Sequence, residues 1–248
     1  MGVLAYFRQL WIDADYYRRA MAAYEGNPSG VPRPAYDRAL EGVLSARRVL
    51  LPAGNRVELE RMARFAAELK TPAILYGAQE AYAVAADLKK LGVAVVVNVK
   101  WPTKPRDADP ELPETLRALT VRDRAPSSPE ALARAGVKFA FTSDGTDAPK
   151  DVLRAVKRSI DDGLSKDDAI RALTLSAAEI YGVANRLGSL DKGKIANLTV
   201  VKGDIFEEGG KVQMVFIDGR KYDPAPEAPA SGAGAAQRPS GTAAEVRQ

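Results

Sequence analysis

Apolar positions along the chain alternate between helical spacing and short continuous runs. Residues 4–25 carry apolar side chains three to five positions apart, which predicts a helix. The run VAVVVNV at 93–99 is apolar throughout, as in a strand that is covered on both faces of a sheet. The predicted strands span 48–53, 73–77, 93–99 and 137–142. The further predicted helices span 56–69, 79–91, 129–135, 151–162 and 166–181, and 101–128 is predicted as a long surface loop.

The order of these elements predicts the fold class. Strands of five to seven residues alternate with helices, which is typical of a parallel sheet with covering helices. The chain holds about four such β/α units, whereas a closed eight-stranded barrel needs twice as many. We therefore expect an α/β fold that forms a partial (β/α)8, TIM-like barrel or an open sheet.

The pattern changes after Gly188. The segment that follows alternates short apolar runs with turns, and FIDGRKY predicts a hairpin around Asp218 and Gly219. Ala, Pro and Gly supply 15 of the last 26 residues, so that segment cannot bury enough surface to offset its ordering entropy. The predicted organisation is a partial barrel over 1–182, a small β-sandwich module over 183–222 and a disordered tail or linker over 223–248.

Composition excludes several kinds of chemistry. The chain of 248 residues has no Cys and no His, which excludes disulfides, thiolate nucleophiles, imidazole bases and His-ligated metal sites. The net charge is +4, without a basic stripe interleaved with aromatic residues, so we expect no nucleic-acid partner. No apolar run approaches the ~20 residues of a membrane helix, so we expect no membrane partner. The sequence predicts no particular cellular location.

Asp144 is the candidate catalytic residue. It belongs to TSDG at 142–145, directly after a predicted strand, and in parallel barrels the active site lies at the carboxyl ends of the strands. The alternative is structural, because Asp often caps a following helix or closes a turn. The local residues by themselves favour this structural alternative.

Two other features favour structural roles. The glycines of GSLDKGKIAN at 188–197 permit tight turns, and their spacing fits neither of the common phosphate-binding loops. An aromatic stripe near the start is better explained by core or interface packing than by a pocket. Its members are Tyr6, Phe7, Trp11, Tyr16, Tyr17 and Tyr24.

Residues 142–221 resemble the C-terminal part of the amidohydrolase superfamily, of the imidazolonepropionase-like type. The resemblance rests on TSDG, GLSKDDAIRALTLSAAEIYGV, RLGSLDKGKIANLTVVKGDIF and VQMVFIDGRK in that order. Asn197 stands where the family usually has Asp. Residues 1–141 resemble the family more weakly, and RQLWIDADYY is similar to a helix of large bacterial proteins with tandem amidohydrolase modules.

The resemblance implies a metal-dependent hydrolase acting on non-peptide C–N bonds. Such a protein has a (β/α)8 barrel, a β-sandwich built from both chain ends, and one or two zinc ions that activate a water molecule. The aspartate after the eighth strand accepts the proton of this water. Of the family's site residues, only this aspartate carries over to the chain, at Asp144.

The family's metal ligands are missing. The strand-five histidine is replaced near Pro52 and the strand-six histidine near Tyr76, and neither residue is a good zinc ligand. Glu80, Lys100 and Asp147 do not supply the missing imidazoles. The His-x-His pair of the first strand is expected upstream of Met1, so we expect no metal or other cofactor in this chain alone.

Three hypotheses follow. In the first, the chain is an amidohydrolase-type hydrolase with a small-molecule substrate, whose site is completed by another amidohydrolase half or by a missing N-terminal segment. In the second, it is a catalytically inactive barrel half that acts as a scaffold or pairing module. In the third, it is a fragment of a longer protein, and its exposed sheet edges favour aggregation.

Overall fold

The computed structural model describes residues 2–69, 71–105, 107, 109, 111–146 and 148–224. Nearly all of the predicted tail over 223–248 lies outside these residues. The first sheet contains β1 (Val49–Ala53), β2 (Ala73–Gly77), β3 (Ala94–Asn98) and β4 (Phe139–Thr142), and the second contains β5 (Leu198–Lys202), β6 (Lys211–Ile217) and β7 (Arg220–Tyr222). The helices are α1 (Gly2–Gly26), α2 (Arg38–Ser45), α3 (Arg56–Glu68), α4 (Ala85–Leu91), α5 (Leu116–Arg124), α6 (Ser128–Ala135), α7 (Pro149–Asp161), α8 (Lys166–Leu173) and α9 (Leu175–Ile180), with 3₁₀ turns η1 (Ala81–Ala83) and η2 (Ala125–Ser127).

The first sheet confirms the predicted α/β class. Its strands lie in the order β1-β2-β3-β4, and each adjacent pair is parallel. Leu75 of β2 pairs with Leu51 of β1 and with Val95 of β3. Because all four strands run the same way, their carboxyl ends meet at one edge of the sheet.

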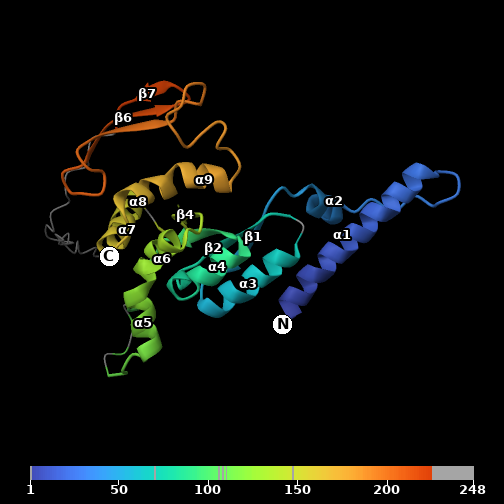
Figure 1. Cartoon of the computed structure of the whole chain (residues 1–248), viewed down its shortest axis with the longest axis horizontal. Helices are drawn as coiled ribbons and strands as arrows, with labels where there is room; N and C mark the ends of the chain where they lie inside the picture. The colour runs from blue at the N-terminus through green and yellow to red at the C-terminus, as the bar shows by residue number, and fades with distance from the viewer. Residues whose placement is uncertain are drawn as a thin grey trace, which may run out of the picture.

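The two faces of this sheet differ in how they are covered. One face carries Leu75, Val95 and Val97 into the main core, which helices α3, α4 and α6 cover (Figure 1). The other face carries Val96 into a small cluster to which Ile180 of α9 also belongs. On this second face of β1, Leu50 is 48% exposed, so within the described residues α9 covers the sheet only in part.

Helix α1 is held against α3 by aromatic packing and one ion pair. The ring of Phe7 stacks on Phe65, and Trp11 meets the same ring edge-on. Arg8 donates two hydrogen bonds to the Glu68 carboxylate, at 2.6 and 2.8 Å. Figure 1 shows the far end of α1 projecting away from the sheet.

The aromatic stripe of α1 is only partly a packing surface. Phe7 and Trp11 pack on α3 and Tyr17 is buried, as the packing interpretation predicts. Tyr6 and Tyr16, in contrast, are about two-thirds exposed, at 67% and 69%.

Residues 101–128 are not one long loop, and that prediction is wrong. Thr115 accepts a hydrogen bond from the amide of Ala118 and so caps helix α5, which η2 then links to α6. The Pro and Asp residues that predicted a loop are concentrated before Thr115, where the described residues form no helix. Their composition concealed the helical segment after it.

Two predicted helices are interrupted. The helix over 166–181 divides into α8 and α9 at Thr174, whose backbone (φ −125°, ψ −90°) is not helical. The helix over 79–91 consists of η1 followed by α4, and the junction residue Val84 is also non-helical (φ −136°). Apolar spacing continues through both junctions, so it gave no signal of the breaks.

The C-terminal strands form a separate antiparallel sheet, which includes the predicted hairpin around Asp218 and Gly219. No residue of β5, β6 or β7 is buried. The sheet lies beyond α8 and α9 in Figure 1. The loop before β6 anchors it, because Phe206 enters the main core and Lys166 of α8 pairs with Asp204 and Glu207.

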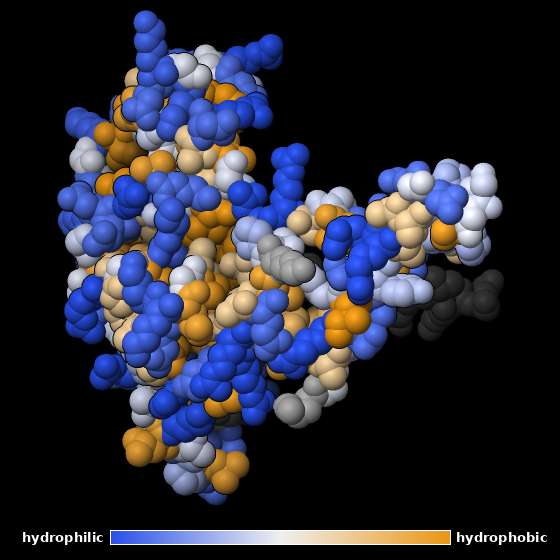
Figure 2. Space-filling model, turned by 45° about the vertical axis from the view of Figure 1, so that its right-hand side comes forward, coloured by the Kyte–Doolittle hydropathy of each residue, from blue (hydrophilic) through white to orange (hydrophobic). Residues whose placement is uncertain are grey.

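The described helices include none that is both long and apolar enough to span a membrane. Apolar side chains nevertheless reach the surface between charged ones over the main body of the molecule (Figure 2). Ile12 of α1 is 58% exposed and Leu190, in the loop before β5, is 86% exposed.

We expect Leu75→Ala to lower the free energy of unfolding by about 2–5 kcal/mol, because it removes a fully buried side chain from the sheet centre. Chemical denaturation followed by circular dichroism measures this change. Leu190→Ala is the matched control, and we expect it to change the free energy by less than about 0.5 kcal/mol. If the two substitutions lowered the free energy of unfolding equally, Leu75 would not lie in the main core.

Candidate active site at the carboxyl edge of the sheet

Polar side chains from three strands gather at the carboxyl edge. Tyr76 is the penultimate residue of β2, Asn98 ends β3, and Asp144 follows β4 by two residues. Side chains alternate between faces along a strand, so Tyr76 shares the face of Val96, opposite the main core. The prediction that Asp144 follows a strand end is thus confirmed, while its catalytic role stays a prediction.

The central contact of the site joins Tyr76 to Asp144. The Tyr76 hydroxyl donates a hydrogen bond of 2.6 Å to Oδ2 of Asp144. Tyr76 is partly buried, and Asp144 is exposed. Partial burial is the main cause that raises the pKa of the Tyr76 phenol, and the bond to Asp144 raises it further, while a bond from Thr142 opposes both.

Lys100 contributes a positive charge beside the turn that holds Asp144. Gly145 has φ +78°, and a Cβ there would lie 2.9 Å from Cδ and 3.3 Å from Nζ of Lys100. The backbone of Lys100 is fixed on both sides, because its amide donates to Asn98 Oδ1 at 2.8 Å and its carbonyl accepts from Gln79 Nε2 at 2.6 Å. The positive φ favours glycine at 145, and a larger residue there would also displace the end of the Lys100 side chain.

The structural alternatives for Asp144 are not observed. Helix α7 begins after Ala148 and has no side-chain cap. The turn after β4 is closed by the carbonyl of Ser143, which accepts from the amide of Thr146 at 2.8 Å. The carboxylate of Asp144 therefore serves the contact with Tyr76.

The other acids weighed from the sequence do not join this site. Glu80 is 7% exposed and accepts from the Arg56 amide and from Arg117, each at 3.1 Å, so it stabilises the start of α3. Asp147 lies outside the described residues. Asn197 belongs to the second sheet, where its Oδ1 accepts from the amide of Asp218.

The residues at this edge do not fit a zinc ion. Within the described ranges no group of three or more His, Cys, Asp or Glu side chains could hold a metal. Pro52 pairs with Tyr76 in the register of β1 and β2 and has no side-chain donor atom. A catalytic zinc needs about three protein ligands, and among the described residues of this edge Asp144 is the single suitable one.

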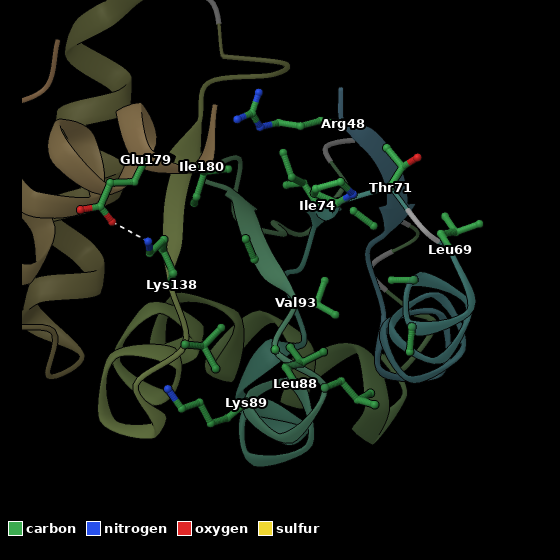
Figure 3. A pocket seen from close by; sticks show the side chains of 18 of the residues that line it. Arg48, Leu69, Thr71, Ile74, Leu88, Lys89, Val93, Lys138, Glu179 and Ile180 are labelled. Carbon is green, nitrogen blue, oxygen red and sulfur yellow. Dashed lines mark ion pairs between the residues drawn. The ribbon is translucent and has the colours of Figure 1, made fainter. Parts of the chain in front are cut away.

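A cavity of about 720 Å³ lies at the opposite, amino edge of the sheet. Figure 3 shows the ion pair between Lys138 and Glu179 on one side of it, and Leu69 and Thr71 on the other. Asp144 and Tyr76 are not among its lining residues. The cavity therefore belongs to the packing of α9 under the sheet and not to the candidate active site.

Comparison with known proteins identifies the family. The model of the amidohydrolase family matches residues 57–221, about two-thirds of the chain, so the chain belongs to this family. The family assignment made from 142–221 is thereby confirmed, and the match extends it upstream through β4, β3 and β2 into α3.

Solved structures show the same fold. An amidohydrolase from Thermotoga maritima MSB8 is similar with a TM-score of 0.71 and 22% identity, over 90% of this chain and 56% of that one. A Xaa-Pro dipeptidase with bound methionine gives a TM-score of 0.56 and 20% identity, over 79% of this chain and 51% of that one. The chain spans about half the length of these two structures.

A short stretch is also similar to a curated enzyme. The adenine deaminase of Moorella thermoacetica (strain ATCC 39073 / JCM 9320) is 37% identical over 65 residues, which are 26% of this chain and 10% of the deaminase. This relative is similar in a segment only.

Sequence reasoning found Asp144 but missed its partner. Tyr76 was considered only as a replaced metal ligand, and Lys100 only as a residue that cannot replace imidazole. The available signal was their position, since each stands at or just beyond the carboxyl end of a predicted strand. That signal places residues at the same edge, but it does not show which side chains reach one another.

The ion pair that fastens α9 to β4 should make stability depend on pH. Lys138 lies 2.6 Å from Glu179 and lowers the pKa of this carboxyl below its ordinary value of 4.5, and Arg171 adds to the effect. The stabilisation is therefore present above pH 4.5 and is lost as the pH falls through the lower, folded-state pKa. We expect Glu179→Gln to cost about 1 kcal/mol or less at pH 7 and less at pH 3 than at pH 7.

Denaturant unfolding of wild type and Glu179→Gln at both pH values measures this difference. Asp87→Asn is the control, because Asp87 forms an exposed pair with Lys90. A loss of stability in Glu179→Gln that is the same at pH 3 and pH 7 would show that the charge is not responsible.

Proposed function

We propose that the chain forms part of an amidohydrolase active site that hydrolyses non-peptide carbon–nitrogen bonds in a small molecule, with Asp144 as general base. One observation carries the proposal: in a chain of this family, an exposed carboxylate stands directly beyond the carboxyl end of a parallel strand. Tyr76 of β2 donates a hydrogen bond to it, and Lys100, which follows β3, lies beside the turn that holds it.

The proposal includes a partial barrel over 1–182 that is completed by another amidohydrolase half or by a segment outside this chain. Its support is the sheet itself, in which β1 and β4 each have a neighbour on one side only within the described residues. The unburied second sheet supports a composite β-sandwich over 183–222 in the same way, because a second layer would bury its apolar face.

Asp144 would act on water. As the water oxygen forms a bond to the substrate carbon, the carboxylate accepts the proton that this oxygen releases. The C–N bond then breaks, and the same proton passes to the departing nitrogen. Because zinc does not fit the residues of this edge, no step is assigned to a metal in this chain.

The substrate class is proposed from a similarity that covers only a short segment. A relative that is similar over a short stretch is named adenine deaminase, and its name indicates that it removes the amino group of adenine. A cyclic amide or amidine is therefore the first class of compound to test.

Asp144→Asn should lower kcat/KM for C–N hydrolysis by about 10²–10⁴-fold, because the amide cannot accept the proton of water. Release of ammonia or amine from cyclic amides and aminopurines measures the rate. Asp151→Asn is the control, because Asp151 is another acid that follows β4 and it pairs with Arg154 on α7. Unchanged hydrolysis in Asp144→Asn would exclude this role.

A scaffold or pairing function is the second candidate. It is favoured by the lack of a metal-binding group among the described residues. A folded chain that hydrolyses none of these compounds, even together with a partner half, would support the scaffold and contradict the enzyme.

A further inference from the structure

We infer that Tyr76 is a positioning residue that holds Asp144 directly by hydrogen bonding, on the side that a metal ion would need. The consequence for catalysis rests on the proposed function, because it takes Asp144 as the base. The contact itself and its effect on zinc binding do not depend on hydrolysis.

The contact spans an intervening strand. Tyr76 is on β2 and Asp144 follows β4, and β3 lies between these strands. Alternate strands are roughly 10 Å apart, so a short side chain on β2 cannot reach a residue beyond β4. Tyr76 packs against the cluster that contains Val96 of β3 and Ala140 of β4, so its side chain lies along this face of the sheet towards β4.

This geometry explains why a tyrosine at position 76 contacts Asp144 in a way that a histidine would not. The family resemblance places a histidine here, and in that arrangement a metal fills the distance between an imidazole and the aspartate. Tyrosine is longer and reaches Oδ2 of Asp144 itself, at 2.6 Å. The hydrogen atom of the phenol then takes up one lone pair of this oxygen, and a cation that binds there must displace it.

The length of the bond indicates its kind. An ionised carboxylate only accepts hydrogen bonds, so Tyr76 must be the donor. A separation of 2.6 Å lies in the range of charge-assisted O–H···O⁻ bonds. Within the described residues Oδ1 of Asp144 has no partner, which leaves it open to a water molecule or substrate on the exposed side.

The surroundings of Tyr76 keep the phenol protonated. Partial burial acts on the pKa of the phenol most strongly, and Asp144 and Thr142 from the β4 side and Tyr181 after α9 also act on it. Burial, Asp144 and Tyr181 favour the neutral phenol, and only Thr142 opposes it. Tyr76 therefore remains a donor over the whole neutral range of pH.

Ultraviolet titration of the phenol tests the contact. The chain has nine tyrosines, so the difference between wild type and Tyr76→Phe isolates the titration of Tyr76. We expect its midpoint above the ordinary value of 10.0. The same difference measured in an Asp144→Asn background should move toward that value, whereas an Asp151→Asn background should leave it unchanged.

Zinc binding tests the inference that the residues around Tyr76 and Asp144 hold no zinc ion. Wild type, Tyr76→Phe and Asp144→Asn are dialysed against zinc chloride, and the bound metal is measured by mass spectrometry. We expect none of the three to retain stoichiometric zinc. Circular dichroism checks folding, and because Asp144 is exposed, Asp144→Asn keeps the zinc test valid if Tyr76→Phe does not fold.

Two results would overturn the inference. One is a Tyr76 titration that does not respond to Asp144→Asn, and the other is stoichiometric zinc that wild type binds and Asp144→Asn loses. A failure of the proposed function is distinct from both. If no compound is hydrolysed but the titration moves as expected, the contact stands and only the catalytic role of Asp144 is lost.

Discussion

Main-chain pairing of four parallel strands determines where every polar group of the candidate site can stand. Because β1 to β4 run the same way, the residues that follow each strand are brought to one edge. Tyr76, Lys100 and Asp144 are far apart in sequence and meet only through this constraint. The main core supports the pairing from one face, where Leu75 and Val95 are fully buried.

The chain belongs to the amidohydrolase family, but its described residues at the carboxyl edge of the sheet do not fit a zinc ion. The amidohydrolase model covers β2 to β4 of the parallel sheet and most of the second sheet. At the edge where the family resemblance places imidazoles, the chain has Pro52 and Tyr76, and the phenol is hydrogen-bonded to the remaining carboxylate. Where the resemblance places a histidine, this chain thus has Tyr76, which holds the carboxylate of Asp144 by a hydrogen bond.

The sequence predicted the strands and Asp144 because their signals are local. Continuous apolar runs mark strands of a covered sheet, and a turn sequence directly after such a run marks its carboxyl end. Helix α5 was missed because Pro and Asp before Thr115 dominated the composition of that region. The contact between Tyr76 and Asp144 was missed because it joins β2 to the turn after β4 across β3, and no local pattern conveys such a contact.

An experimental structure of the full chain at neutral pH, crystallised with zinc chloride, tests the central claim most directly. The account predicts a Tyr76 hydroxyl about 2.6 Å from Oδ2 of Asp144, with no anomalous zinc peak on this carboxylate. A zinc ion coordinated by Asp144 at about 2.0–2.2 Å, with Tyr76 turned away, would contradict it.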